Sequence, residues 1–278
     1  GAQSVILSTR LAPDPLGGGG LTSPVRVQWE MADDEQFAHI VRRGSVPARP
    51  EDGHSVHVTV QGLRPDRWYF YRFQAQGEVS RVGRTRTFPA RGELAARMRF
   101  AVVSCQDYQN GFYAAYNDIL QQDLDCIVHT GDYMYEYGAN PTAVRSHTGG
   151  ETKTLTDYRN RYALYKLDAQ LQECHARFPF IAIWDDHEVQ DNYAGPVSEY
   201  GVPAVEFAQR RTAAYQAYYE NMPLRRSTRP HRGRMTLYRQ LNFGRRARLF
   251  MLDGRQYRTD QPCTPIAASV GADCPATH

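Results

Sequence analysis

Residues 126–136 of this 278-residue chain read CIVHTGDYMYE, an apolar run that ends abruptly at Gly131 and Asp132. The run from Asp125 to Thr130 is typical of a strand covered on both faces, as in the parallel sheets of α/β proteins. A carboxylate directly after such a strand lies at the carboxyl end of the sheet, where open α/β sheets bind their ligands. The segment therefore predicts a layered α/β domain with a site at this strand end.

Two other apolar runs end in the same way. Residues 100–104 are followed by Cys105, and residues 180–184 are followed by Asp185-Asp186-His187-Glu188. Helices are predicted for residues 112–122, 156–176 and 205–221, and a further strand of central type is predicted for residues 248–253. The alternation of strands and helices favours the same layered architecture.

The first ninety residues follow another pattern. Short strands with alternating apolar and polar residues are predicted at 5–7, 25–29, 55–60, 68–73 and 85–88, with glycine and proline turns between them. This pattern is typical of a small all-β sandwich. Residues 63–71 resemble the tyrosine corner of fibronectin type III-like modules. We therefore expect an all-β domain at 1–92 and the α/β domain at 93–278.

The composition is that of a globular protein. Hydrophobic residues make up 41% of the chain and charged residues 23%, and no run of apolar residues is long enough for a transmembrane helix. The net charge of +3 is too small to argue for nucleic acid, so none is expected as a partner. Five cysteines are an odd number, which leaves at least one of them as a free thiol or a ligand.

The side chains after the three strand ends suggest a metal site. A thiol, several carboxylates, a phenol and an imidazole would meet in one crevice, and such a mixture of sulfur, oxygen and nitrogen donors is typical of metal binding. Carboxylates placed so close together also need a cation to offset their repulsion. Each motif alone is common, but the three together favour a metal centre.

The same motifs resemble the PhoD-type alkaline phosphatases and phosphodiesterases of the calcineurin-like metallophosphoesterase superfamily, a family that includes iron-dependent secreted phospholipase D. The resemblance implies an α+β, layered metallophosphoesterase domain, with a β-sandwich core flanked by helices, behind a small all-β fibronectin III-like domain. It extends over nearly the whole chain, and the matching segments are residues 5–13, 104–106, 129–138, 158–162, 184–195 and 252–258.

The resemblance also implies the metal ligands. Cys105 would bind an iron(III) as a thiolate, and Tyr135 would bind the same iron as a phenolate. Asp132 would bridge the iron and a second, harder cation, expected to be Ca²⁺ or another divalent metal. Asn192 is the preferred ligand of that second metal. Asp186 is the weaker candidate, because it stands where the superfamily has an asparagine.

Two residues would act on the substrate. His187 would protonate the leaving group or stabilise the transition state, and Arg255 would clamp the phosphate oxygens as a bidentate fork. The two metals would activate a hydroxide and stabilise both oxygens of an in-line displacement. The implied protein is a secreted, extracellular hydrolase of phosphate esters, whether a phosphodiesterase, a phospholipase D or an alkaline phosphatase, with a phosphate ester or phospholipid as substrate.

Two other functions fit parts of the sequence. The chain could be a secreted binding module whose α/β part has lost its chemistry, in which case it carries no stoichiometric iron. It could also be a hydrolase with a cysteine nucleophile that uses Cys105 and His187, which chelators would not inhibit.

The sequence departs from the family pattern in one respect. A later Gly-Asp-x-His-type motif, which the family uses to complete both metals, does not occur after Asp132. We therefore expect the chain to be truncated or nicked, with a second polypeptide from the same precursor carrying the remaining ligands. A disulfide between Cys263 and Cys274 would suit an exported protein, and Cys126 and Cys174 are either buried or paired with each other.

Overall fold

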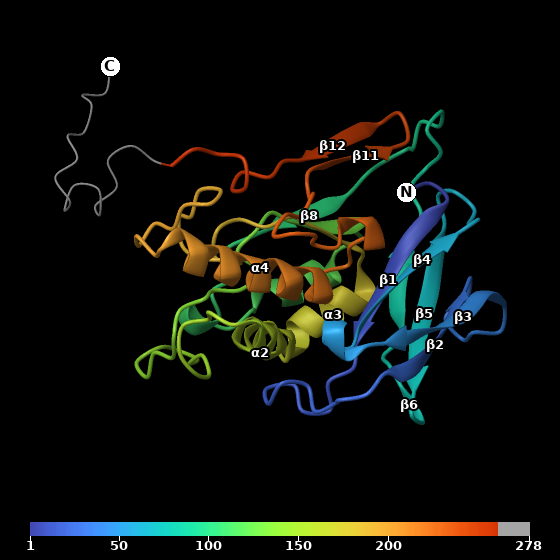
Figure 1. The fold of residues 1–278 in the computed structure, drawn as a ribbon. Helices are drawn as coiled ribbons and strands as arrows, with labels where there is room; N and C mark the ends of the chain where they lie inside the picture. Colours follow the sequence, from blue (N-terminus) through green and yellow to red (C-terminus); the bar gives the residue numbers. More distant parts are fainter. Residues whose placement is uncertain (261–278) are drawn as a thin grey trace, which may run out of the picture.

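The computed structural model describes residues 1–260, which form an all-β part and a layered part that contains the helices (Figure 1). Each part has its own hydrophobic core. One core is built from residues between Val5 and Phe73, and the other from residues between Phe88 and Met251. The domain boundary expected at residue 92 lies close to this change of core and stays a prediction.

Two antiparallel sheets pack face to face in the all-β part. Their inward side chains, among them Leu7, Val27, Val58 and Phe73, meet in one core. The smaller sheet pairs β1 with β4, and the larger has the order β3-β2-β5-β6 with β7 paired to β5. The strands are β1 (Ser4–Arg10), β2 (Val25–Ala32), β3 (Ile40–Ala48), β4 (Ser55–Gln61), β5 (Trp68–Ala75), β6 (Glu78–Val79) and β7 (Gly83–Arg86).

All five strands predicted for this part are present, but β3 and the short β6 are missing from the prediction. β3 contains Arg42-Arg43-Gly44-Ser45 and is mostly exposed, so its sequence lacks the alternation that marks a half-buried strand. It forms because its backbone pairs with β2 at an edge of the sheet. The tyrosine corner is made by Tyr69, whose hydroxyl accepts a hydrogen bond from the Arg64 N–H at 3.0 Å.

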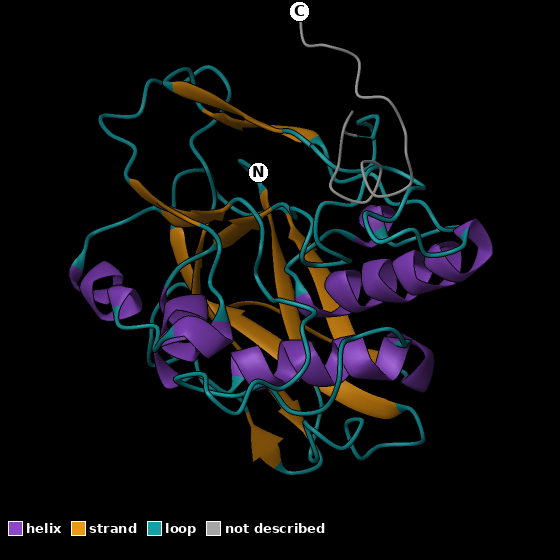
Figure 2. Ribbon diagram, turned by 90° about the vertical axis from the view of Figure 1, so that its left-hand side faces the viewer, coloured by secondary structure: helices purple, strands orange, loops and turns teal. Residues whose placement is uncertain are grey.

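A three-stranded parallel sheet lies in the layered part. Its strands are β8 (Phe100–Val103), β9 (Cys126–His129) and β10 (Phe180–Ala182), in the order β10-β9-β8. Because the strands are parallel, their carboxyl ends meet at the same edge of the sheet, as the sequence predicts. A separate hairpin, β11 (Arg239–Phe243) and β12 (Ala247–Met251), lies at one edge of the molecule, on the opposite side from α2 (Figures 1 and 2).

Four α-helices belong to the layered part. The helix predicted for residues 156–176 is wrong as one element, because the chain forms two helices there. Asp168 separates them: its carboxylate accepts hydrogen bonds from the N–H groups of Gln170 and Leu171, which caps the second helix. No helix within residues 1–260 is both long and apolar enough to cross a bilayer. The helices are α1 (Ala115–Gln121), α2 (Leu155–Lys166), α3 (Ala169–Arg177) and α4 (Ala204–Asn221), and 3₁₀ turns cover Pro50–Asp52, Tyr108–Asn110 and Arg226–Thr228.

Tyrosine dominates the core of the layered part. The tyrosine rings pack against apolar side chains, and their hydroxyl groups form hydrogen bonds with polar backbone groups. The Tyr165 hydroxyl accepts hydrogen bonds from the N–H groups of Tyr108 at 3.2 Å and Tyr135 at 3.1 Å. The core therefore holds the loops that follow β8 and β9. The fully buried tyrosines are Tyr133, Tyr158, Tyr162, Tyr165, Tyr193, Tyr215 and Tyr218.

Two strands differ from prediction in their surroundings. The sequence predicts that β8 is covered on both faces, but it is an edge strand of its sheet among the described residues, and Phe100 and Val102 are exposed. β12 was expected to be a central strand, but it pairs only with β11 among the described residues, and Phe250 is exposed. Both runs are largely apolar, and an apolar run alone does not say how many neighbours a strand has.

The cysteines within the described residues are free. Cys126 and Cys174 are both buried thiols, which settles the choice between burial and pairing in favour of burial. Cys105 is a free thiol on the surface of the strand-end loop. The disulfide expected between Cys263 and Cys274 lies outside residues 1–260.

Candidate metal centre

Backbone hydrogen bonds hold the three strand ends together beyond the sheet. Cys105 N–H donates to the Gly131 carbonyl, and Gln106 N–H donates to the Asp132 carbonyl, both at 3.1 Å. The buried Glu188 side chain links the other two ends: its carboxylate accepts from Tyr133 N–H at 2.6 Å and from Asp185 N–H at 2.9 Å. The loops after β8, β9 and β10 therefore form one rigid edge.

Gly131 allows the loops after β9 and β10 to approach each other. Its φ is +121°, and a Cβ atom placed on it would lie 2.4 Å from the backbone nitrogen of Asp185. No L-residue with a side chain fits that space without moving one of the loops.

We expect Gly131→Ala to lower the free energy of unfolding by about 3 kcal/mol, because both the backbone conformation and the contact with Asp185 become unfavourable. Urea denaturation measures the change. Gly92→Ala is the matched control, since a Cβ atom at Gly92 meets nothing within 4 Å. Equal stability of the two variants would contradict the close approach seen here.

Three of the predicted ligands share an unusual backbone conformation. Cys105, Asp132 and Asn192 have φ values of 53°, 54° and 54°, in the left-handed region that residues with side chains seldom adopt. Such residues gather at functional sites, where the surrounding structure compensates for the strain. Here the strained backbone sets the direction of three potential metal ligands, one in each of three loops.

Asp132, Asp186 and His187 form the centre of the site. One potential ligand atom from each lies within 4.8 Å of the others. Asp132 and Asp186 are buried, and Asp132 Oδ1 has no hydrogen-bond partner among the described residues. Burial, together with the charges of Asp186 and Asp185, raises the pKa of Asp132 to about 6. An unpartnered carboxylate oxygen beside a second carboxylate is a favourable environment for a cation, so these residues fit a metal.

Tyr135 and Cys105 adjoin this centre. The Tyr135 hydroxyl donates to Asp132 Oδ2 at 3.4 Å, and the Cys105 thiol contacts both Asp132 and Tyr135. Burial and the neighbouring Asp132 raise the pKa of each of these two groups. The structure thus brings a thiol and a phenol to the same carboxylate, as the resemblance implies.

His187 is held on the other side by Glu136. Its Nδ1 lies 2.8 Å from Oε2 of Glu136, and its ring stacks on Tyr135 with centroids 4.0 Å apart. Burial alone would lower the pKa of His187, but the hydrogen bond and charge of Glu136, with Asp186 and Asp132, raise it to about 9. The imidazole is therefore fixed in orientation and favoured in its charged form.

Arg255 and Asn192 contact Asp186. Arg255 Nε donates to Asp185 Oδ1 at 2.5 Å, and its Nη2 lies 3.3 Å from Asp186 Oδ1, while Nη1 is buried with no partner among the described residues. The Asn192 backbone N–H donates to Asp186 Oδ2 at 2.6 Å. All seven residues predicted for the site thus lie in one connected network, with Arg255 on two carboxylates.

Three buried residues that position the site are absent from the predicted set. Glu188 joins two strand ends, and Glu136 orients His187 while also accepting from Asp191 N–H at 2.6 Å. Arg161 on α2 donates to the carbonyls of Tyr135 and Tyr137, which fixes the loop after β9. The segment 158–162 is part of the family resemblance, but only the fold shows which backbone Arg161 holds.

A cavity of about 560 Å³ lies next to Glu136, the residue that holds His187. Glu136 and Tyr137 line it on the side of the site, and Tyr200, Val202 and Glu206 line it elsewhere. Its volume is within the range of small-molecule pockets. None of the seven predicted site residues lines it, and Glu136 is its link to His187.

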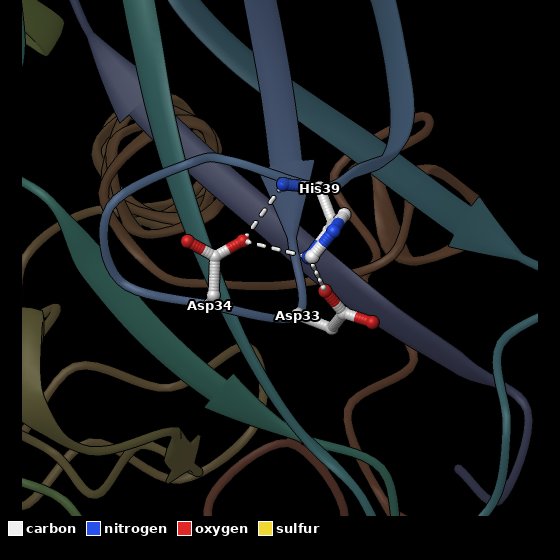
Figure 3. A group of neighbouring side chains, drawn as sticks. All are labelled: Asp33, Asp34 and His39. Carbon is white, nitrogen blue, oxygen red and sulfur yellow. Dashed lines mark hydrogen bonds and ion pairs between the residues drawn. The ribbon is translucent and has the colours of Figure 1, made fainter.

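A second group of side chains with ligand atoms within 4.8 Å of one another lies in the turn between β2 and β3 (Figure 3). It consists of Asp33, Asp34 and His39. Asp34 already accepts hydrogen bonds from the N–H groups of Ala38 and His39, at 3.0 and 2.8 Å. His39 is largely exposed, with 81% of its side chain accessible. This group therefore stabilises a turn, and nothing else about it points to a ligand.

Comparison with known proteins identifies relatives for both parts of the chain. The PhoD-like phosphatase family matches residues 100–277, and its N-terminal domain matches residues 1–89. Alkaline phosphatase D of Bacillus subtilis (strain 168) is 50% identical over 266 residues, which are 94% of this chain and 46% of that protein. The chain thus spans about half the length of this relative.

Solved structures agree with the sequence relatives. A structure described as that of PhoD has a TM-score of 0.92 and 50% identity, and the match covers 94% of this chain and 51% of the other. A purple acid phosphatase from yellow lupin has a TM-score of 0.53 at 13% identity, over 87% of this chain and 41% of the other, which shows a likeness of fold alone. The fold is metallophosphoesterase-like, and the chain belongs to the PhoD-like phosphatase family.

Proposed function

We propose that the protein hydrolyses phosphate esters at the strand-end site. The observation that carries the proposal is the convergence of Asp132, Asp186 and His187 within 4.8 Å, with the Cys105 thiol and Tyr135 phenol on Asp132. Hydrolysis of phosphate esters is very slow without catalysis and requires strong electrostatic stabilisation of the transition state. A buried site that collects acidic donors for cations supplies that stabilisation.

The donor set favours iron(III) beside a harder divalent cation. A thiolate from Cys105 and a phenolate from Tyr135 suit iron, whereas carboxylate and amide oxygens from Asp186 and Asn192 suit Ca²⁺. Asp132, between the two sets, would contact both metals. When bound, such a pair supplies Lewis acidity that offsets negative charge on the phosphoryl group.

Two residues of the chain would act on the substrate itself. Glu136 holds His187 by Nδ1, so Nε2 is the nitrogen left to give a proton to the leaving group. Arg255 would place a guanidinium donor on a phosphate oxygen, since its Nη1 has no partner among the described residues. Both residues keep their orientation through contacts with buried or half-buried carboxylates.

The cavity beside Glu136 favours a phosphodiester over a compact monoester. Its volume of about 560 Å³ leaves room for a second ester group, including a phospholipid headgroup. We further propose that the protein acts outside the cell, in line with the family resemblance.

Activity before and after metal removal tests the proposal. The purified protein is assayed on bis(4-nitrophenyl) phosphate, 4-nitrophenyl phosphate and phosphatidylcholine, then again after chelation and after return of iron and Ca²⁺. The proposal is supported if activity is lost on chelation and recovers when iron and Ca²⁺ are returned. The substrate that is hydrolysed fastest identifies the class of ester. Full activity after chelation would favour a cysteine nucleophile, and no iron with no activity would favour a binding module.

Tyr135→Phe tests the iron assignment. A phenolate or thiolate on iron(III) gives a visible charge-transfer band, so the variant should show a shifted or bleached band and a lower turnover rate. Tyr238→Phe is the control, because Tyr238 is exposed and lines neither the site nor the cavity beside Glu136. A colourless, iron-free and fully active wild-type protein would rule the assignment out.

Arg255→Lys tests the phosphate contact. The variant keeps the charge but loses the planar fork, and we expect the turnover rate to fall about tenfold with normal metal content. Steady-state kinetics and metal analysis measure the two quantities. An unchanged rate would mean that Arg255 only supports Asp185 and Asp186.

We also propose that a second polypeptide contributes further metal ligands. The five donor residues named above are fewer than two metals require, since Ca²⁺ alone takes about 6–8 oxygens. Native and denaturing mass spectrometry of the active protein tests this. A single species of 31.6 kDa with full activity would exclude it.

A further inference from the structure

A second cavity lies between the all-β part and the layered part. It has a volume of about 290 Å³, and none of the residues of the candidate metal centre line it. β1 and β7 form one side, and the segments around β10, β11 and the end of α4 form the other. Any occupant would therefore contact both parts of the protein.

The charged side chains that line this cavity are all positive. Its lining contains no Asp or Glu side chain. Arg86 also lines it, but ion pairs with Asp66 and Asp125 neutralise that residue. Four further Arg and Lys side chains remain, and these are Arg84, Lys166, Arg225 and Arg239.

The four remaining cations donate to neutral oxygens rather than to carboxylates. Lys166 Nζ donates to the Asn221 carbonyl at 2.7 Å, and Arg225 Nη2 donates to Ser4 Oγ at 3.0 Å. Arg239 donates to two backbone carbonyls, and Arg84 Nε donates to another at 3.2 Å. These bonds orient the cations without neutralising their charge.

Lys166, Arg84 and Arg239 are half-buried, whereas Arg225 is exposed. Partial burial of three positive charges is unfavourable without an anion. Burial, with a contribution from Arg10, lowers the pKa of Lys166 to about 8. Burial also lowers the pKa of Arg239 and Arg84. Buried charges are normally paired, and an anion in the cavity would compensate several cations at once.

We propose that this cavity binds a small phosphate-bearing anion that bridges the two parts of the protein. Guanidinium and ammonium donors on several walls match an oxyanion that accepts hydrogen bonds in several directions. The volume of about 290 Å³ suits inorganic phosphate or a phosphate ester of a small alcohol, and not a nucleotide or lipid. This site is independent of the proposed hydrolysis.

Calorimetric titration tests the proposal, with Asp132→Asn as the parent protein so that the metal centre contributes little. Inorganic phosphate and glycerol 3-phosphate are titrated separately, against chloride at equal ionic strength. We expect saturable binding of at least one phosphate and a higher unfolding temperature in its presence. The ligand that binds more tightly shows whether the cavity takes free phosphate or a phosphate ester.

Two variants locate the anion. Arg225→Gln should raise the dissociation constant about tenfold, because one charge-assisted hydrogen bond is lost. Arg226→Gln is the matched control: its side chain is exposed like that of Arg225 but does not line the cavity. Lys166→Met should weaken binding further, and if that variant fails to fold, the Arg225→Gln comparison still decides.

Three outcomes would overturn the proposal. The first is the absence of saturable phosphate binding in the Asp132→Asn parent. The second is binding by the wild-type protein that disappears in that parent, which would place the phosphate at the metal centre. The third is equal affinity in Arg225→Gln and Arg226→Gln, which would place it elsewhere on the surface.

Discussion

Asp132→Asn is expected to lower the turnover rate by about three orders of magnitude, because several kcal/mol of transition-state stabilisation depend on the metals that this carboxylate would join. Asp132 lies beside four other residues of the predicted site. Tyr135 donates to it, Cys105 contacts it, and Asp186 and His187 lie within 4.8 Å of it. An amide keeps the shape of the side chain but removes the charge and one strong ligand oxygen.

The fold should survive this change. Asp132 is buried next to Asp186, so the substitution removes repulsion between like charges, and no hydrogen bond to Oδ1 is lost. We therefore expect the metal-free variant to unfold at a temperature no lower than that of the metal-free wild type. Loss of activity with retained stability separates a ligand from a structural residue.

Metal analysis and steady-state kinetics check the prediction. Iron content should fall together with the turnover rate. Asp118→Asn on α1 is the control, since Asp118 is exposed and belongs to neither group of candidate metal ligands. A variant with full metal content and a normal rate would show that Asp132 is no ligand, and the proposed function would lose its main support.

The strand ends could be predicted because chemistry and pattern coincide in a few consecutive residues. A buried run followed directly by Gly131-Asp132 is common alone, but together with the runs that end at Cys105 and at Asp185-Asp186-His187 it favours strands that lead into one site. The parallel order of β8, β9 and β10 then brings these ends together without further information. Local sequence therefore predicts which residues converge.

The supporting residues could not be predicted, because their partners are far away in the chain. Glu136 contacts His187 across 51 positions, and Glu188 contacts Tyr133 across 55. In the sequence, each is one acidic residue among others near a motif. The left-handed backbone at Cys105, Asp132 and Asn192 is also invisible locally, since none of these residues is a glycine.

Errors in the fold have a similar origin. β3 forms by pairing with β2, although Arg42 and Arg43 give it the composition of a loop. β8 and β12 are apolar enough for central strands, yet each lies at an edge among the described residues. Periodicity reports the faces that a segment could bury, and pairing is decided by segments elsewhere in the chain.

His187→Asn is expected to show an effect that depends on the leaving group. If Nε2 gives its proton to the departing oxygen, the variant should lose a factor of about 10² to 10⁴ in turnover rate on an alkyl phosphodiester. On bis(4-nitrophenyl) phosphate the loss should be much smaller, because 4-nitrophenolate leaves without protonation. A residue that only shaped the site would slow both substrates equally.

Glu136→Gln separates positioning from proton transfer. The amide can still bond to His187 Nδ1, which lies 2.8 Å from Oε2, but it no longer offers the negative charge that favours the imidazolium. We expect the same dependence on the leaving group as for His187→Asn, at smaller magnitude, with little change in KM or metal content. Glu206→Gln is the control, since Glu206 lines the same cavity but is exposed on α4 and makes no contact with His187. If Glu136→Gln slows both substrates by the same factor, Glu136 only holds the loop through Asp191, and the charge of His187 plays no part in expelling the leaving group.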